Sequence, residues 1–481
     1  MSVENLSKTN RNMIVAVMII SAFIAILNQT LLNTALPQIM KGLHINESKS
    51  QWLVTGFMLV NGVMIPLTAF LMDRVKTRPL YLIAMGIFLL GSIIASIAPS
   101  FGILMLARVI QAIGAGIIMP LMQFTLFMLF PKNERGFAMG LAGLVIQFAP
   151  AIGPTLSGLV IDLSSWRMPF IIVVGISLIG FIFGAIFIKS YNTTKDTKLD
   201  KRSVIYSTFG FGLMLYAFSS AGNLGFDSPI VIVSLLVSLF IIWVFIKRQL
   251  QVPNPLLNLI VFKNRVFTLT TITSMIVMMS MIGPALLIPL YVQNALGLSA
   301  FLSGLVIMPG AIINGIMSIF TGKFYDKYGA RPLIIIGFSL LTVFSIMLCF
   351  LSADTSYLYL VIVYALRMFS VSLLMMPLNT AGINALHKRE ISHGTAISNF
   401  GRVTAGSLGT ALMVTVMTIG TKVYTQNARG IENKELLQRQ AIANGVDYSF
   451  IVISVFVVIG FSIALFIKEN RDVNEINTRK V

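Results

Sequence analysis

Residues 104–120 read Leu104-Met-Leu-Ala-Arg108-Val-Ile-Gln111-Ala-Ile-Gly-Ala-Gly-Ile-Ile-Met-Pro120, and the apolar run continues to Leu129 with Arg108 as its one charge. A run of this length predicts a helix that crosses a membrane, which needs about 20 apolar residues. A charge at bilayer depth costs about 2.5–3.5 kcal/mol on insertion scales, so such a residue faces a polar cavity or a partner. The rest of the chain must supply that cavity.

The composition of the whole chain agrees with this stretch. Of 481 residues, 56% are hydrophobic and 11% are charged, and the mean hydropathy is +0.88. Soluble domains average about 25% charged residues. We therefore expect an all-α polytopic membrane protein with fourteen spans. They lie at about 13–36, 51–71, 80–98, 103–129, 136–161, 168–189, 204–221, 229–247, 265–290, 300–321, 332–351, 357–386, 394–420 and 447–468.

The basic residues predict the orientation. With the N-terminus inside, 25 of the 35 Lys and Arg residues fall in cytoplasmic loops and tails, 7 outside and 3 within spans. This asymmetry favours a plasma-membrane protein with both termini cytoplasmic. It also explains the net charge of +18 without nucleic acid, which we do not expect as a partner.

Other targeting and redox signals are weak. The first apolar run is longer than the 7–15-residue core of a signal peptide and is expected to be retained. Cys349, the one cysteine, lies in an apolar helix and offers neither a disulfide nor a metal site. We expect no cofactor and no metal.

Internal repetition divides the chain. Asp73, a following cation and a later Arg-Pro-Leu recur at Asp326, 253 residues on. Further pairs follow at separations of 257 to 259 residues: Arg108 and Arg367, Pro120 and Pro377, Gly136 and Gly394, Gly143 and Gly401. The pattern predicts a leader (1–12), two related six-helix halves (13–189 and 265–468), a linker with two extra helices (190–264) and a tail (469–481). Such duplication is typical of alternating-access transporters.

Polar side chains within the spans are the candidates for a substrate cavity. They are Asn28, Asn33, Asn61, Gln123, Gln147, Asn314 and Asn379. The alternative is that these amides only join helices, for about 0.6 kcal/mol each. A further intramembrane cation, Arg402, has Asn399 near it.

The fifth span is rich in glycine and proline. It contains Gly143, Pro150, Gly153, Pro154 and Gly158. Glycines permit close helix approach and prolines remove backbone hydrogen bonds, so the segment is a packing seam, a hinge or both.

Several stretches together resemble the major facilitator superfamily, and within it the fourteen-span drug:proton antiporters of the QacA/EmrB type. The likeness is greatest to the lincomycin-resistance multidrug exporters of Gram-positive bacteria and covers nearly the whole chain. It rests on Trp52-Leu-Val-Thr-Gly-Phe-Met-Leu59 with Asp73-Arg74, Leu106-Ala-Arg108-Val-Ile-Gln111-Ala-Ile-Gly114-Ala-Gly116, Pro150-Ala-Ile-Gly153-Pro154 with Gly158, and Ser165-Trp166-Arg167.

The resemblance implies three groups of site residues. A cytoplasmic gate would consist of Asp73, Arg74, Arg78, Asp326, Lys327 and Arg331. Proton coupling would involve Arg108, Gln111 and, as a titratable acid, Asp162. The antiporter motif would span Gly143 to Gly158. The chain departs from the family at Asn28, where an aspartate is common.

The acidic residues limit the cargo and the coupling. None of the 17 falls in the middle of a predicted span, so no membrane carboxylate offsets the desolvation of a cationic drug. We therefore expect weaker export of dications than of neutral, zwitterionic or anionic compounds. Asp162, Asp73 and Asp326 are the candidate proton carriers. The three histidines, His44, His387 and His393, are expected in loops.

The leading hypothesis is a monomeric multidrug exporter that exchanges small, mostly apolar antimicrobial compounds for protons, with membrane lipid around it. The alternative is a uniporter or importer of one solute with the same fold. An intramembrane enzyme is disfavoured because the predicted spans contain neither histidine nor acid.

Overall fold

The computed structural model describes residues 8–45, 47–190, 200–253, 255–428 and 433–468. These residues form fourteen α-helices and two short 3-10 helices, and the described part of the chain contains no strand. The helices are α1 (Lys8–Leu43), α2 (Glu47–Arg74), α3 (Thr77–Ser96), α4 (Phe101–Leu129), α5 (Arg135–Leu163), α6 (Met168–Phe187), α7 (Lys201–Leu224), α8 (Pro229–Gln251), η2 (Leu259–Lys263), α9 (Arg265–Asn294), α10 (Ala300–Tyr328), α11 (Ala330–Met347), α12 (Tyr357–Asn384), η3 (Lys388–Glu390), α13 (Ile391–Asn427) and α14 (Lys434–Ala464).

The helix count confirms the all-α polytopic prediction. Among the described residues, thirteen helical segments are long and apolar enough to cross a membrane. In the remaining helix, α5, the described apolar segment is shorter and covers Arg135–Ala149.

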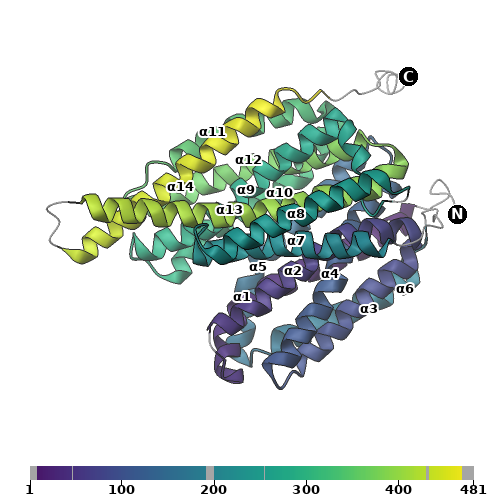
Figure 1. The fold of residues 1–481 in the computed structure, drawn as a ribbon, viewed down its shortest axis with the longest axis horizontal. Helices are drawn as coiled ribbons and strands as arrows, with labels where there is room; N and C mark the ends of the chain where they lie inside the picture. Colours follow the sequence, from purple (N-terminus) through teal and green to yellow (C-terminus); the bar gives the residue numbers. More distant parts are fainter. Residues whose placement is uncertain (1–7, 46, 191–199, 254, 429–432, 469–481) are drawn as a thin grey trace.

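The helices pack as two bundles with a pair between them (Figure 1). We call α1–α6 the N-terminal bundle and α9–α14 the C-terminal bundle. Within the first, α3 packs on α4 and α6, and α1 packs on α5; within the second, α9 packs on α13 and α10 packs on α12. The contacts between bundles are made mainly by α5 with α10 and by α2 with α13.

The two additional helices lie against this interface. α7 packs on α8, on α2 and on α13, and Phe211 of α7 contacts Phe400 of α13 with ring centroids 4.3 Å apart. Asp200, just before α7, accepts two hydrogen bonds from the Arg248 guanidinium of α8, at 2.6 and 2.8 Å. These bonds hold the pKa of Asp200 at about 2. The pair therefore remains ionised at any physiological pH.

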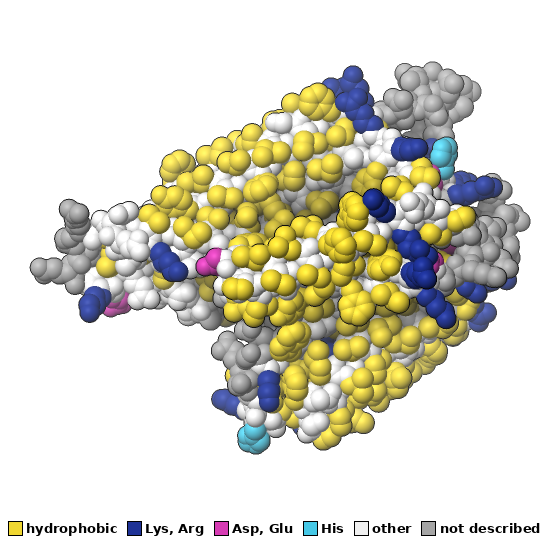
Figure 2. Space-filling view, viewed as in Figure 1, with side chains coloured by type: hydrophobic (Ala, Val, Ile, Leu, Met, Phe, Trp, Pro, Cys, Tyr) yellow, Lys and Arg dark blue, Asp and Glu magenta, His cyan; other side chains and the backbone are white. Residues whose placement is uncertain are grey.

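Both chain ends lie at one end of the molecule (Figure 1), which we call the termini face. The opposite end is the far face. Figure 2 shows hydrophobic side chains over the middle of the molecule and most of the visible Lys and Arg side chains gathered toward the termini face. A lipid-facing belt between polar ends accounts for this distribution.

Two sequence expectations near the C-terminus are wrong. The expected outer loop 422–447 is largely helical, because α13 continues to Asn427 and α14 begins at Lys434. Asn433 caps α14 by accepting from the backbone N–H groups of Glu435 and Leu436. His393 lies in α13 and is buried, not in a loop.

Candidate functional site

Asp326, near the end of α10, binds the start of α5 across the interface. Its two carboxylate oxygens accept hydrogen bonds from the backbone N–H groups of Gly136 and Phe137, both at 2.8 Å. The first N–H groups of a helix have no intrahelical partner, and a negative charge is favourable there. One carboxylate therefore caps a helix of the other bundle.

Asp73, near the end of α2, makes the reciprocal contact. It accepts a hydrogen bond from the Ser392 hydroxyl at 2.6 Å and lies 3.4 Å from Nε2 of His393. Both partners belong to the first turn of α13, the fifth helix of the C-terminal bundle. Nδ1 of His393 accepts from the backbone N–H of Asn258 at 3.3 Å. A neutral imidazole with its proton on Nε2 satisfies both contacts.

Glycines allow α5 and α10 to approach closely beside the Asp326 cap. A Cβ atom on Gly136 would lie 2.5 Å from the carbonyl oxygen of Gly322, and one on Gly322 would lie 2.4 Å from that of Gly136. A Cβ on Gly140 would lie 2.5 Å from the carbonyl oxygen of Ser318. This glycine seam and the two acid caps close the two bundles against each other at the termini face, and we call the three contacts together the latch.

The other predicted gate residues lie around the latch. Arg78 donates to the carbonyl oxygen of Ala185 at 2.8 Å, within the N-terminal bundle. The Arg74 guanidinium lies 6.0 Å from the Phe70 ring, and Lys327 lies 5.0 Å from the Tyr328 ring. Arg331 is exposed in the first turn of α11. Their role in gating stays a prediction.

A contact that the sequence did not suggest strengthens the closure. Arg135 donates to the side-chain oxygen of Asn384 at 2.7 Å, which joins α5 to the end of α12. Asn384 in turn donates to the Tyr325 hydroxyl at 3.1 Å.

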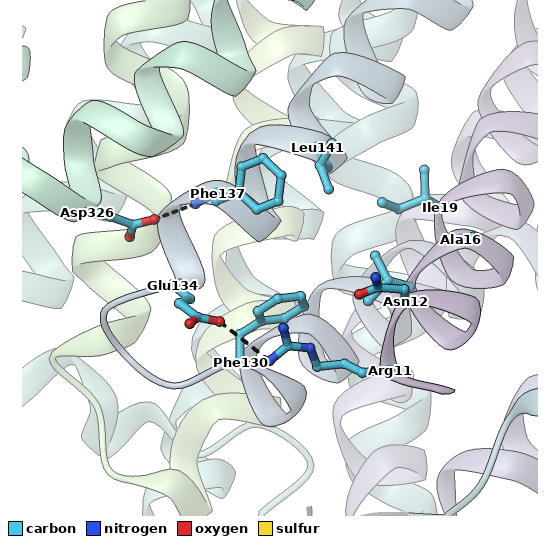
Figure 3. A pocket seen from close by; sticks show the side chains of 10 residues that line it. Arg11, Asn12, Ala16, Ile19, Phe130, Glu134, Phe137, Leu141 and Asp326 are labelled. Atoms are coloured by element: carbon cyan, nitrogen blue, oxygen red, sulfur yellow. Dashed lines mark hydrogen bonds and ion pairs between the residues drawn. The ribbon is translucent and has the colours of Figure 1, made fainter. Parts of the chain in front are cut away.

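A pocket of about 620 Å³ opens beside the latch (Figure 3). Its walls come from α1, the α4–α5 connection, α5 and Asp326; the lining residues are Arg11, Asn12, Val15, Ala16, Ile19, Phe130, Glu134, Phe137, Leu141 and Asp326. Arg11 lies 3.4 Å from a Glu134 oxygen and 4.6 Å from the Phe130 ring centroid. The pocket is large enough for a small organic molecule, but its one basic group is already paired.

Arg108 is fully buried within the N-terminal bundle. Its Nε donates to the carbonyl oxygen of Leu53 at 3.3 Å and its Nη1 to the Gln111 side chain at 2.9 Å. Gln111 donates to Ser92 of α3 at 3.0 Å, and the Phe57 ring centroid lies 4.1 Å from the guanidinium. Arg108 therefore joins α4 to α2 and α3.

Arg367, its counterpart in the repeat, is also fully buried. It donates to Ser345 of α11 at 3.2 Å and to the carbonyl oxygen of Ser280 in α9. Ser345 lies 253 residues after Ser92; Arg367 binds Ser345 directly, whereas Arg108 is joined to Ser92 through Gln111. Both arginines bind groups of their own bundle.

Arg402 differs because its network crosses between the bundles. Its guanidinium donates to Asn379 of α12 at 3.0 Å and to Asn399 at 2.5 Å. Asn399 donates to the Gln123 side chain of α4, in the other bundle, at 2.9 Å. Ser398 donates to Asn379 at 3.3 Å and completes the set. We call these five side chains the Arg402 network.

The remaining predicted cavity residues are dispersed. Asn28 lines a narrow gap between α1 and α6 that is too small for a water molecule, and its amide nitrogen has no hydrogen-bond partner in the described structure. Asn61 lies at the seam of α2 with Gly116 of α4. Gln147 and Asn314 are buried on α5 and α10. Both polar atoms of the Asn314 side chain lack partners among the described groups.

The sequence predicts that amides such as Asn28, Asn33 and Gln111, together with backbone carbonyls and cavity water, hold Arg108. The Gln111 side chain and the Leu53 carbonyl are acceptors as expected, whereas Asn28 is not among the acceptors found. Asn28 points toward α6 because that face of α1 packs on Pro169 and Phe170.

Some predicted residues lie outside the described side chains. They are Asn33, Pro150, Pro154, Gly158 and Asp162. Gly153 is described, and a Cβ there would lie 2.1 Å from the Thr30 hydroxyl, so α5 approaches α1 closely at this point. Gly143 faces the Ser318 side chain of α10.

The sequence-based site omitted Ser392, His393 and Ser398, and it did not connect Arg402 and Asn399 with the predicted cavity residues Gln123 and Asn379. A signal existed for the network, since Asn399 and Arg402 are three residues apart and share a helix face. No signal existed for the pairing of Asp73 with α13, which lies 319 residues along the chain.

The sequence comparisons identify the family. Residues 18–410 match the model described as Major Facilitator Superfamily. The chain belongs to the major facilitator superfamily. It is a multi-pass membrane transporter and not an enzyme.

Relatives and a solved structure agree with this assignment. The chain is 44% identical to the uncharacterized MFS-type transporter YcnB of Bacillus subtilis over 96% of each chain. It is 38% identical to the lincomycin resistance protein LmrB of Listeria monocytogenes, covering 95% of this chain and 96% of that protein. The proton:xylose symporter XylE superposes with a TM-score of 0.65 at 15% identity, over 96% and 97% of the two chains, which shows the shared major facilitator fold.

Proposed function

We propose that the protein exports structurally varied small antimicrobial compounds in exchange for protons, by alternating access between the two bundles. The proposal is supported by the relatives named for lincomycin resistance and by others named as multidrug export proteins. It is also supported by an interface at which polar contacts between the bundles accompany the shared apolar core.

The reciprocal acid caps are the observation that carries the alternating-access part. Each bundle presents one carboxylate to the fifth helix of the other, at equivalent positions of the repeat. The sorting of Lys and Arg predicts that the termini face is cytoplasmic. On that orientation the latch closes the cytoplasmic side in this conformation.

Opening the latch would cost little energy per contact. A charge at a helix N-terminus contributes about 0.3–1 kcal/mol, and up to about 2 kcal/mol when partly buried. A few such contacts can be lost and regained with the binding energy of a cargo molecule and a proton. Two conformations of similar free energy are what alternating access requires.

For coupling we propose Arg108, Gln111 and Asp162, as the family resemblance implies. The buried Arg108–Gln111–Ser92 chain ties α4 to α2 and α3, so a movement of α4 would move these helices together. Asp73 and Asp326 remain alternative proton carriers, because protonation of either would weaken its contact with the opposite bundle.

Efflux from whole cells tests the proposal. Bacteria with and without the protein are loaded with an uncharged fluorescent drug, and its loss is followed with and without a protonophore. Export predicts faster loss in cells with the protein and no difference once the protonophore is present. Loss that is equally fast with the protonophore would favour a uniporter.

A further inference from the structure

The Arg402 network places a guanidinium at the interface that must separate during transport. Arg402 is 8% exposed, and its described partners are the neutral side chains of Asn379, Ser398 and Asn399. No carboxylate pairs with it among the described residues. Asn399 lies eight residues inside α13, about 12 Å from the termini face at 1.5 Å per residue. The charge is therefore within the membrane and beyond the latch.

The repeat shows that packing alone does not require these polar groups. The face of α13 that carries Thr395, Ser398, Asn399 and Arg402 corresponds, 258 residues earlier, to Phe137, Gly140, Leu141 and Leu144 of α5. That equivalent face of α5 is apolar and contains part of the glycine seam. A polar set therefore occurs on only one of two equivalent helices.

The other two buried arginines give a second contrast. Arg108 and Arg367 join helices of their own bundles, where no separation is needed. Only the Arg402 network, of these three, includes a hydrogen bond between bundles, from Asn399 to Gln123. When the bundles part, Arg402 and Asn399 remain on α13 and lose the Gln123 oxygen.

We propose that Arg402, Asn379 and Asn399 form a binding site for the carboxylate of an organic anion or zwitterion, exposed when the bundles separate at the termini face. The inference rests on the proposed function and specifies its cargo. In the closed conformation the amide oxygens of Asn379 and Asn399 occupy donors of Arg402 that a carboxylate would take. A carboxylate is a stronger acceptor for a guanidinium than an amide oxygen is, because it carries a full negative charge and can accept two parallel N–H bonds.

Cargo and the Gln123 side chain compete for the amide hydrogens of Asn399. When Asn399 donates to Gln123, the two bundles are joined and the interface is closed. Release of cargo to the far side would free Asn399 to bind Gln123 again. The network is then both the recognition site and one contact of the closed state.

A pair of probes isolates the carboxylate. Rhodamine B carries a free carboxylate, and its ethyl ester differs only in masking that group. Fluorescence anisotropy measures the binding of each probe to the purified full-length protein in detergent. The expected result is that the wild type binds rhodamine B about tenfold more tightly than the ester or better, the size expected of one hydrogen bond to a charged group.

Three variants assign the preference to Arg402. Arg402→Gln is expected to bind both probes with similar affinity. Asn399→Asp places a fixed carboxylate beside Arg402, so it should remove the preference without leaving a buried charge unpaired, which protects the test against misfolding. Arg265→Gln is the matched control, because it makes the same substitution at an exposed arginine of α9, and it should keep the wild-type preference.

The inference fails if the wild type binds the ester as tightly as rhodamine B, or if Asn399→Asp keeps the preference. Equilibrium binding requires no proton gradient, so the result is independent of the efflux test. Loss of the preference with intact proton-driven efflux would refute only the carboxylate site. An intact preference without proton-driven efflux would refute only the proposed coupling.

Discussion

Asp73 and Asp326 stand 253 residues apart in the chain, and each carboxylate binds the first turn of the fifth helix in the opposite bundle. The two contacts are not chemically identical. Asp326 accepts from two backbone N–H groups, whereas Asp73 accepts from a serine hydroxyl and lies beside His393. The repeat thus conserves the position of the acid while the partner differs.

Asp326→Asn should shift the protein toward the conformation that is open at the termini face. The substitution keeps the shape but removes the charge, and its NH2 group cannot accept one of the two backbone N–H bonds. The expected loss is therefore at least the charge–helix contribution of about 0.3–2 kcal/mol, or about two- to thirtyfold in the population ratio. Spin labels at Lys132→Cys and Lys388→Cys, in a Cys349→Ser background, report the separation of the bundles at this face. Asp354→Asn is the control, because Asp354 is exposed on the α11–α12 loop. An unchanged distance distribution would show that the cap does not hold the closed state.

Gly322→Ala should prevent full closure. The added Cβ would lie 2.4 Å from the backbone oxygen of Gly136, so one helix must move. Gly304→Ala is a matched control in the same helix, since a Cβ there meets nothing within 4 Å.

We expect Gly322→Ala to lengthen the distance between the same two labels and to reduce drug efflux, while Gly304→Ala resembles the wild type. Normal efflux with Gly322→Ala would mean that transport does not require the observed closure.

The two bundle-internal arginines predict a stability effect. Arg108→Ala leaves the Gln111 oxygen without its donor and removes the second hydrogen bond of the Leu53 carbonyl, and an unsatisfied buried group costs about 1–3 kcal/mol. A lower midpoint of thermal unfolding is expected for Arg108→Ala and, for the same reason, for Arg367→Ala. If Arg108 also serves coupling, Arg108→Lys should retain drug exchange down a concentration gradient but lose its dependence on an imposed pH gradient. Equal loss of both activities would restrict Arg108 to a structural role.

Asn28→Asp tests the prediction that cationic drugs are exported weakly because no carboxylate lies in the middle of a membrane span. The substitution nearly preserves volume and adds an acid within the first helix, where the described structure leaves the Asn28 amide nitrogen without a partner. We expect the variant to gain export of a monovalent cationic dye relative to an uncharged drug. A ratio equal to that of the wild type would show that the charge at this position does not select cargo.

The sequence predicts the helices better than the contacts between them. The run around Arg108 identified a span because apolar length alone determines membrane crossing. Counting apolar residues ended the thirteenth span too early, at 420, and began the fourteenth too late, at 447. In the structure α13 continues to Asn427 and α14 begins at Lys434, because both helices extend as polar helix beyond their apolar parts. Hydropathy does not distinguish a polar helical turn from a loop.

The sequence predicted only part of the site, and Asn28 and Gln123 illustrate why the rest could not be predicted. Both are amides in apolar helices, and composition assigned both to a cavity. The rotation of α1 turns Asn28 toward α6, whereas the rotation of α4 turns Gln123 toward Asn399. Such rotations follow from the packing of all helices together. The Asp73 contact with α13 likewise depends on how two distant segments meet.

Transport into proteoliposomes under an imposed pH gradient tests the central claim most directly. Vesicles containing the wild-type protein, with an acidic lumen, are given an uncharged fluorescent drug, which acid trapping cannot accumulate. The account predicts accumulation in the lumen that a protonophore abolishes and that Gly322→Ala reduces while Gly304→Ala does not. Uptake that reaches the same level with and without the gradient would contradict proton-driven exchange between the two bundles.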